Sequence, residues 1–333
     1  MSTEEKMIPC ETCGEKFKRA GDLKRHMAKK KPCVKKDIPA ADGLPTLLIT
    51  KPVLKWVGGK TQILDAVLEL FPREMVNYHE PFLGGGSVLF GLLDYRKRGY
   101  IKITGSIYAS DLNPHLINLY STLQNNVEAL IVEITKLIGE YEALTTEENR
   151  EAYYYATRMK FNTLAERNTP NAAALLVFLN KTGFRGMYRE GPKGLNIPFG
   201  HYANPGIADV DHLRAVSQLL AGVIFTHAGF TDSIAKVLPG DFMYLDPPYA
   251  PEAEKSFVGY TADGFDENTH RQLFTVVKEK VAAGASMLMS NADVALVKNA
   301  FPEPAYQTKI ISCRRAINSK DPGKRTNEVL IKG

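Results

Sequence analysis

Hydrophobic residues after position 46 follow two patterns, one with the spacing of helices and one in short continuous runs. Apolar stripes among scattered charges predict helices over residues 115–140 and 151–182. Another helix is expected after the Gly58-Gly59 turn, where helical spacing relates Ile63, Leu64, Val67, Leu68 and Phe71. Strands are expected over the short runs at residues 75–79, 106–110, 242–245 and 286–290. Because helices and strands alternate, the pattern predicts an α/β fold.

Glycine-rich or acidic segments follow these strands. The first leads to the glycine loop at residues 80–87, the second to Asp111 and the third to Asp246. Ligands bind at the carboxyl ends of strands in open α/β sheets, so we expect a binding site at this edge.

Composition limits the class of protein. The 333 residues allow two or three domains, and 44% hydrophobic residues exclude a chain that is disordered throughout. No apolar run approaches the roughly 20 residues of a membrane-spanning helix, and the N-terminus lacks the apolar stretch of a secretory signal. We therefore expect an intracellular protein that does not enter membranes.

Positive charge is concentrated at the N-terminus. The formal net charge is +5, yet residues 1–36 hold eleven basic and five acidic side chains, a surplus of six. Residues 37–333 are therefore nearly balanced, with 31 basic and 32 acidic side chains. Such a basic segment suggests an attraction to nucleic acid.

Three of the four cysteines lie in the same basic segment. Cys10 and Cys13 are separated by two residues, and His26 and Cys33 follow after twelve and six more, which predicts a Cys-Cys-His-Cys structural zinc site. The spacing resembles a single ββα zinc finger over residues 1–36, followed by a linker at 37–50. In that resemblance Arg19 and Arg25 would face DNA bases. A purely structural finger or a solvated basic arm remains an alternative.

The glycine loop Phe82-Leu83-Gly84-Gly85-Gly86 and Asp111 together suggest a nucleotide-like cofactor. Glycines let the backbone turn tightly near a ligand, and an acid after the next strand typically accepts hydrogen bonds from ribose hydroxyls. Either feature alone is weak, since Asp111 could instead cap the helix after Asn113-Pro114.

Asp246-Pro247-Pro248-Tyr249 is the most informative tetrapeptide. The Asp246 carboxylate and a proline carbonyl could together accept both hydrogens of a base amino group, which favours a more nucleophilic nitrogen. Tyr249 could stack on a base flipped out of a duplex. A rigid turn after a strand is the alternative interpretation.

From Leu54 to Ile331 the chain resembles the Dam-type (D12 class, α group) S-adenosylmethionine-dependent DNA adenine-N6 methyltransferases. The resemblance is carried by residues 54–60, the glycine loop, Asp111, the 180–189 segment and residues 246–249, in the family's order. It implies a Rossmann-like methyltransferase sheet within residues 51–333, with a mostly helical target-recognition domain inserted at 116–205. Adenine in GATC is the implied target.

The resemblance also implies roles for individual residues. The catalytic residues would be Asp246, Pro247, Pro248 and Tyr249. The cofactor would lie against Trp56, Lys60, Glu80, Phe82, Gly84, Gly86, Asp111 and Asp246. Duplex DNA would contact Lys55, Phe184, Arg185, Met187, Arg189, Pro198, Arg314 and Arg315. Asn327-Glu328 resembles the start of the last strand and is expected to be structural.

Several partners and alternatives follow. We expect a monomer or weak dimer, associated with DNA in a bacterium or a virus- or phage-infected cell, with a cognate restriction endonuclease as a candidate partner. An RNA or protein amino-methyltransferase would not need the 180–189 segment, and a nicotinamide-dependent oxidoreductase would leave residues 246–249 unexplained. A DNA-binding regulator on an inactive scaffold is the third alternative.

Overall fold

A computed structural model describes residues 8–9, 16–17, 26, 47, 51–250, 265–314 and 325–333. Side chains are described at residues 26, 47, 51–250, 265–312 and 326–333. The chain forms two compact units, residues 1–47 and 48–333. In the first, strands β1 (Ile8–Pro9) and β2 (Lys16–Phe17) pair antiparallel.

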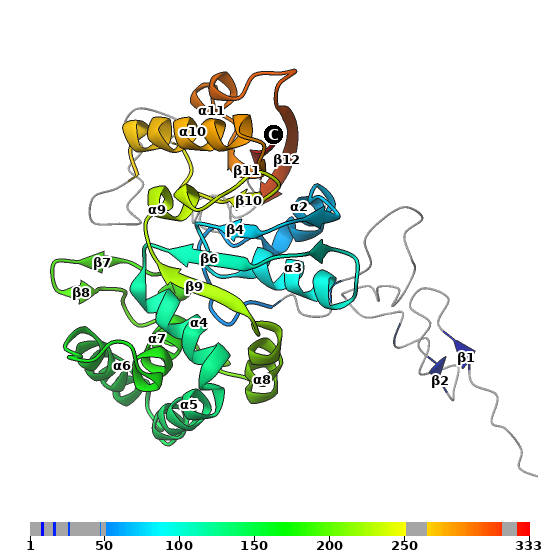
Figure 1. Cartoon of the computed structure of the whole chain (residues 1–333). Helices are drawn as coiled ribbons and strands as arrows, with labels where there is room; N and C mark the ends of the chain where they lie inside the picture. The colour runs from blue at the N-terminus through cyan, green and yellow to red at the C-terminus, as the bar shows by residue number, and fades with distance from the viewer. Residues whose placement is uncertain are drawn as a thin grey trace, which may run out of the picture. The chain divides into compact units, whose positions relative to one another are not determined.

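A seven-stranded sheet organises the second unit (Figure 1). Its order is β12-β13-β11-β10-β4-β6-β9, and β11, β10, β4, β6 and β9 pair in parallel. Strand β13 is antiparallel to both of its neighbours. The bounds are β4 Tyr78–Glu80, β6 Ile107–Asp111, β9 Val223–His227, β10 Phe242–Leu245, β11 Ser286–Ala292, β12 Gln307–Arg314 and β13 Arg325–Lys332. A mixed α/β fold with a largely parallel sheet is thus confirmed.

The strand order reverses at β4. The chain continues from β4 to β6 and β9 on one side and then crosses to β10 on the other. Loops that leave the carboxyl ends of β4 and β10 therefore diverge, which opens a crevice where α/β proteins bind ligands. The glycine loop and Asp246 lie at this point.

Helices cover both faces of the sheet. One core joins α9 (Phe230–Ala235), α10 (Glu267–Ala282) and α11 (Ala295–Ala300) to the side of β10 and β11 that carries Met243, Leu245, Met287 and Met289. Helices α2 (Leu64–Glu69), α3 (Ser87–Lys97) and α4 (Pro114–Asn125) belong to the other face. There Phe71 packs on Phe242 and Tyr120 stacks on Phe225. Alternation along each strand sorts its residues between these cores.

Between α4 and β9 the chain forms four more α-helices and a hairpin, of which α5, α7 and α8 pack against α4 (Figure 1). The bounds are α5 Val127–Glu142, α6 Glu147–Asn162, α7 Pro170–Thr182, α8 Val210–Leu219 and the strands β7 Glu190–Gly191 and β8 Gly194–Leu195. The boundaries 116–205 of an inserted domain remain a prediction.

Two of the expected helices are each divided in two. The 115–140 helix breaks at Asn126, whose φ of −142° is not helical. The 151–182 helix breaks before Thr169, whose side chain accepts the Ala172 N–H and caps α7 with Pro170 at its first position. Helical structure is thus confirmed over most of both ranges, and only the expectation that each range forms one continuous helix was wrong.

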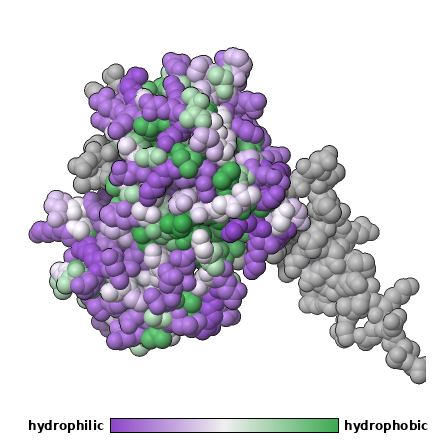
Figure 2. All heavy atoms as spheres, viewed as in Figure 1, coloured by the Kyte–Doolittle hydropathy of each residue, from purple (hydrophilic) through white to green (hydrophobic). Residues whose placement is uncertain are grey.

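The smaller elements also differ from expectation. The expected strand 75–79 is split into β3 (Glu74–Met75), which pairs with β5 (Lys102–Ile103), and β4. The expected strand at 242–245 is confirmed as β10. None of the described helices is long and apolar enough to cross a bilayer. Figure 2 shows a face that is mostly hydrophilic with scattered apolar residues.

Candidate active site

Asp246 directly follows the buried strand β10 and forms an ion pair with Lys60. The Lys60 ammonium lies 2.7 Å from Asp246 Oδ1 and donates to the Gly58 carbonyl at 2.7 Å. Lys60 is only 4% exposed, at the start of the short helix η1 (Lys60–Gln62). Burial raises the pKa of Asp246 to about 6, against the lowering effect of Lys60. The carboxylate is therefore ionised at neutral pH and can accept hydrogen bonds.

The turn after Asp246 is anchored at three successive residues. His270 Nε2 on α10 lies 3.0 Å from the Pro248 carbonyl oxygen, to which it can donate. The Tyr249 hydroxyl donates to Glu328 on β13 at 2.8 Å. The Ala250 N–H donates to the side-chain oxygen of Asn291 on β11 at 3.0 Å.

None of these anchoring roles was predicted from the sequence. Glu328 was expected to be structural, and no role was predicted for His270. Their positions beside residues 248–250 depend on how α10 and β13 pack, so no local sequence signal could have identified them.

The glycine loop requires its glycines for two reasons. Gly84 and Gly86 have φ angles of 49° and 70°, in the left-handed region that side chains disfavour. A Cβ on Gly85 would lie 2.8 Å from Trp56 Cβ, so the loop backbone and the tryptophan approach closely. The buried hydroxyl of Tyr120, on α4, donates to the Gly84 carbonyl at 3.0 Å.

Asp111 connects the loop to the next strand. Its Oδ2 accepts the Gly84 N–H and its Oδ1 accepts the Asn113 N–H, both at 2.9 Å. Burial raises the pKa of this carboxyl, while the two backbone hydrogen bonds lower it. The cap of α4 is Asn113, whose side chain accepts from His115, so the alternative role of Asp111 as that cap was wrong. Each carboxylate oxygen still has a lone pair for a further donor.

Acidic and aromatic side chains surround the same edge. Glu80 is 3% exposed, accepts the Tyr78 hydroxyl at 2.6 Å, and has its pKa raised to about 8 by burial. Phe82 packs against Phe230 with ring centroids 5.9 Å apart, and Trp56 lies 5.4 Å from Tyr188. Aromatic faces suit a cation such as a sulfonium, whereas Glu80, with its pKa raised to about 8, contributes a mostly neutral carboxyl at neutral pH.

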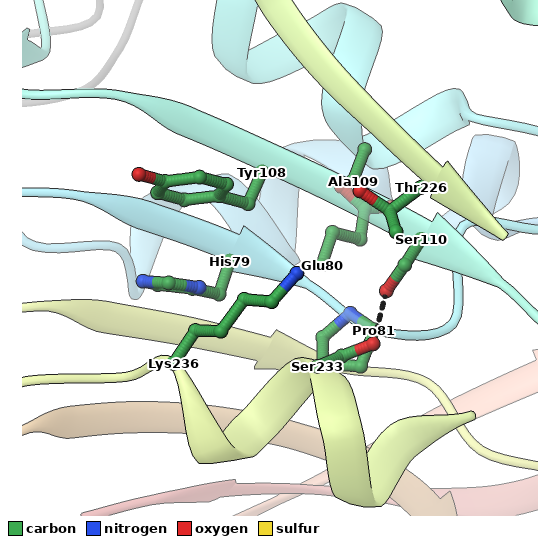
Figure 3. Close-up of a pocket in the computed structure, with 9 residues that line it drawn as sticks. All are labelled: His79, Glu80, Pro81, Tyr108, Ala109, Ser110, Thr226, Ser233 and Lys236. Carbon is green, nitrogen blue, oxygen red and sulfur yellow. Dashed lines mark hydrogen bonds between the residues drawn. The ribbon is translucent and has the colours of Figure 1, made fainter. Parts of the chain in front are cut away.

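A hollow adjoins this edge on the α9 side of the sheet (Figure 3). Glu80 and Pro81 contribute to its lining, and Ser110 and Ser233 are joined across it by a hydrogen bond of 2.7 Å. His79 on β4 is buried, where it stacks on Tyr108 and pairs with Asp241 at 2.9 Å. Asp246 and Tyr249 do not line this hollow.

The predicted DNA-contacting residues also lie together. The buried Asn180 side chain accepts the Lys55 N–H at 2.8 Å and donates to the carbonyls of Lys55 and Gly186 at 2.8 and 2.9 Å. Phe184, which is 43% exposed at the start of η2 (Phe184–Gly186), donates its N–H to the Pro198 carbonyl at 2.9 Å. The Asn180 side chain thus connects the backbone of Lys55 to the loop at residues 184–186.

Two arginines of this loop, Arg185 and Arg189, each make a hydrogen bond that fixes part of the residue. Arg185 has a φ of 56° and donates its N–H to the Tyr202 hydroxyl at 2.8 Å. Arg189 is exposed and donates from Nε to Asn196 Oδ1 at 2.7 Å. Met187 is half-buried between them.

Two lysines that were not among the predicted DNA contacts, Lys51 and Lys181, lie beside the predicted contact Lys55. Lys181 is 7% exposed, and burial together with the charges of Lys51 and Lys55 lowers its pKa to about 8. Within the described part of the chain, none of the three forms an ion pair with a carboxylate. Three cations that pair with none of the described carboxylates suit a DNA phosphate.

The other predicted ligands lie outside this description. Arg19, Arg25, Arg315, Cys10, Cys13 and Cys33 are outside the described residues, and Arg314 is described only as the last backbone position of β12. Of the four expected zinc ligands only His26 is described, and it is buried. No cluster of three His, Cys, Asp or Glu side chains occurs among the residues described.

Comparison with known proteins agrees with this geometry. The family of D12 class N6 adenine-specific DNA methyltransferases matches residues 56–317. The chain is 36% identical to the type II methyltransferase M.MjaIII of Methanocaldococcus jannaschii, over 84% of this chain and 98% of that protein. It is 30% identical to the DNA adenine methylase of Haemophilus influenzae, over 86% and 94% of the two chains. It is also 30% identical to the retron Ec67 DNA adenine methylase of Escherichia coli, over 84% and 90%. The chain therefore belongs to the D12 class of N6 adenine-specific DNA methyltransferases.

Proposed function

We propose that this adenine-specific DNA methyltransferase acts on an adenine that has rotated out of duplex DNA within GATC, with Asp246 and Tyr249 at the reacting base. The observation that carries the proposal is the position of Asp246, which lies with Lys60 at the sheet edge where β4 and β10 diverge.

S-Adenosylmethionine fits the residues of this edge. The loop offers a backbone cradle that a Cβ on Gly85 would fill, and Trp56 and Phe82 offer aromatic faces. Asp111 would accept the ribose hydroxyls, and Lys60, Glu80, Gly84 and Gly86 would line the rest. When bound, the cofactor supplies the electrophilic methyl group.

Two acceptors would hold the adenine amino group. Asp246 is one, and the Pro247 carbonyl is the second. The Pro248 carbonyl faces His270. The Pro247 carbonyl, in contrast, accepts a hydrogen bond from none of the described donors. A pair of acceptors can orient both amino hydrogens, which leaves the nitrogen lone pair directed at the methyl carbon.

Target recognition would fall to the loop tied together by Asn180. Phe184 would stack in the duplex, and Arg189 would contact a guanine edge, a pairing worth about 1–3 kcal/mol of discrimination. Support comes from the exposure of Phe184 and from the Asn196 contact that orients Arg189. Phosphate and groove contacts are assigned to Lys55, Arg185, Met187, Pro198, Arg314 and Arg315.

The N-terminal segment would add a zinc-held DNA contact. Its four proposed ligands are Cys10, Cys13, His26 and Cys33, with Arg19 and Arg25 facing the duplex. The proposed boundaries are 1–36 for the finger, 37–50 for the linker and 116–205 for the inserted domain. A monomer or weak dimer and a cognate restriction endonuclease complete the proposal.

Transfer of labelled methyl groups from S-adenosylmethionine to duplex DNA tests this function. Wild type should label the duplex, and Asp246→Ala should lower the rate at least 100-fold while cofactor binding stays measurable. Asp211→Ala, which removes a 98% exposed carboxylate on α8, should behave as wild type. Sequencing of modified bases gives the target, and methylation outside GATC would contradict the proposed site but not the chemistry.

A further inference from the structure

Tyr249 has a side chain that needs to be held in one orientation if a base is to stack on it. The residue is half-buried, at the edge of the site. In the described part of the chain it makes two polar contacts: its hydroxyl donates to Glu328 at 2.8 Å, and the Lys60 ammonium lies 4.9 Å from the ring centroid. Of these, only the hydrogen bond fixes the far end of the ring.

Glu328 reaches Tyr249 because β13 runs against the rest of the sheet. Its backbone lies opposite Ala292, at the carboxyl end of β11, in the antiparallel register of β13. The first residues of β13 therefore arrive at the edge where the parallel strands end. The contact joins residues that are 79 positions apart.

A carboxylate at this position has an electrostatic cost. The charge of Glu328 contributes to raising the pKa of Asp246 and of Tyr249, so it opposes ionisation of the acceptor that the proposed reaction uses. No described lysine or arginine forms an ion pair with Glu328. A residue that only completed the strand would not need this charge. A negative charge does, however, strengthen the hydrogen bond that Glu328 accepts from the Tyr249 hydroxyl.

The backbone around Tyr249 is held independently. His270 faces the Pro248 carbonyl and Asn291 accepts the Ala250 N–H. Loss of the Glu328 side chain would therefore leave the turn in place and release the ring alone.

We propose that Glu328 is a positioning residue for methyl transfer, which orients the Tyr249 ring through its hydroxyl so that the flipped adenine stacks in line with the methyl donor. This inference rests on the proposed function. Glu328 itself touches neither base nor cofactor, and it exchanges no proton in the reaction.

The test compares Glu328→Ala, Glu328→Gln, Tyr249→Phe and the double variant Glu328→Ala/Tyr249→Phe. In single-turnover transfer, Glu328→Ala and Tyr249→Phe should each be slower by roughly 10-fold. The double variant should be no slower than either, because both changes remove the same bond. Glu328→Gln, whose amide oxygen can accept from the phenol, should retain most of the rate, and the dissociation constant of S-adenosylmethionine should not change.

A spectroscopic measurement reports on stacking directly. A GATC duplex with 2-aminopurine at the adenine position should become brighter with Glu328→Ala than with wild type, because a loosened ring quenches the flipped base less. Glu140→Ala is the matched control. It removes another tyrosine–carboxylate bond, from Tyr153 at 2.7 Å on α5 and α6, and should change neither rate nor fluorescence.

Two results would overturn the inference. One is a wild-type rate and fluorescence in Glu328→Ala, and the other is a double variant slowed by the product of the single effects. Thermal denaturation identifies a variant that is merely unfolded, in which case Glu328→Gln and Tyr249→Phe decide. If wild type transfers no methyl group, the proposed function fails, and the 2-aminopurine signal still decides whether Glu328 orients a stacking ring.

Discussion

Lys60 and Asp246 illustrate how two buried charges can set the pH range of a reaction. Burial favours the neutral carboxyl, and the ammonium 2.7 Å away favours the ionised one. Burial prevails, since the pKa of Asp246 rises from 3.8 to about 6. The fraction of ionised carboxylate, which is the form that would accept an amino hydrogen beside the Pro247 carbonyl, therefore grows as the pH increases through 6.

We expect the pH profile of kcat/KM for methylation to show an ascending limb near pH 6. Lys60→Met keeps a buried chain of similar length but removes the charge that lowers the pKa, so the limb should move to higher pH. Lys309→Met, which removes an exposed pair with Glu69, should leave the limb in place. An unchanged limb in Lys60→Met would show that the ascending step belongs to another group.

At the scale of elements, the glycine loop depends on α4. Tyr120 on this helix donates to the Gly84 carbonyl, and the strand before α4 supplies Asp111, which accepts the Gly84 N–H. A Cβ on Gly86 would lie 2.9 Å from the Tyr120 hydroxyl, so the tyrosine directly supports the loop. Both polar groups of Gly84 are thereby fixed from outside the loop.

Tyr120→Phe should weaken cofactor binding. The change leaves a carbonyl without its donor, which costs about 1–3 kcal/mol, and the loop should become less ordered. We expect a lower melting temperature and an S-adenosylmethionine dissociation constant raised several-fold, as measured by calorimetry.

Tyr154→Phe provides the matched comparison. Tyr154 is also buried and donates to a backbone carbonyl, that of Ile197, at 2.9 Å. Because Arg158 also donates to the Ile197 carbonyl, at 2.6 Å, the change should lower the melting temperature less than Tyr120→Phe and leave cofactor affinity unchanged. Equal losses of affinity in both variants would indicate a general loss of stability rather than a loop effect.

At the scale of the whole molecule, the surplus of positive charge and the proposed catalytic residues lie in different parts of the chain. Residues 1–36 have a surplus of six positive charges, whereas residues 37–333 are nearly neutral. Within residues 37–333, individual lysines would act at defined positions, Lys60 beside Asp246 and Lys181 beside a DNA phosphate. General attraction to DNA would come from the N-terminal segment.

Removal of zinc should therefore weaken DNA binding and flatten its dependence on salt. Chelation or Cys10→Ser should reduce the slope of log K against log salt by about 3 if three or four phosphate contacts are lost. Cys313→Ser, at the cysteine outside the proposed ligand set, is the control. Fluorescence anisotropy over a salt series measures the slopes. Equal slopes in Cys10→Ser and wild type would show that the N-terminal segment does not contribute to DNA binding.

Local motifs were predictable to different degrees. The glycine loop and residues 246–249 were recognisable because their chemistry depends on adjacent residues, and β10 was correctly bounded by its buried run. Helix boundaries inside 115–182 were not, because the chain leaves helical geometry at Asn126 without a side-chain cap and resumes it at the Thr169 cap after the non-helical residues 163–169. Strand β9 was not predicted, because it is an edge strand with a less regular apolar pattern.

The sequence by itself determined the family and the reaction class, and it predicted the residues nearest the cofactor and base, because each motif is a short run of adjacent residues. Only the tertiary structure decided what holds those motifs. Tyr120, His270, Asn291 and Glu328 reach them from other elements, and the antiparallel insertion of β13 brings Glu328 to Tyr249. Such contacts depend on strand order and register, which no local pattern encodes.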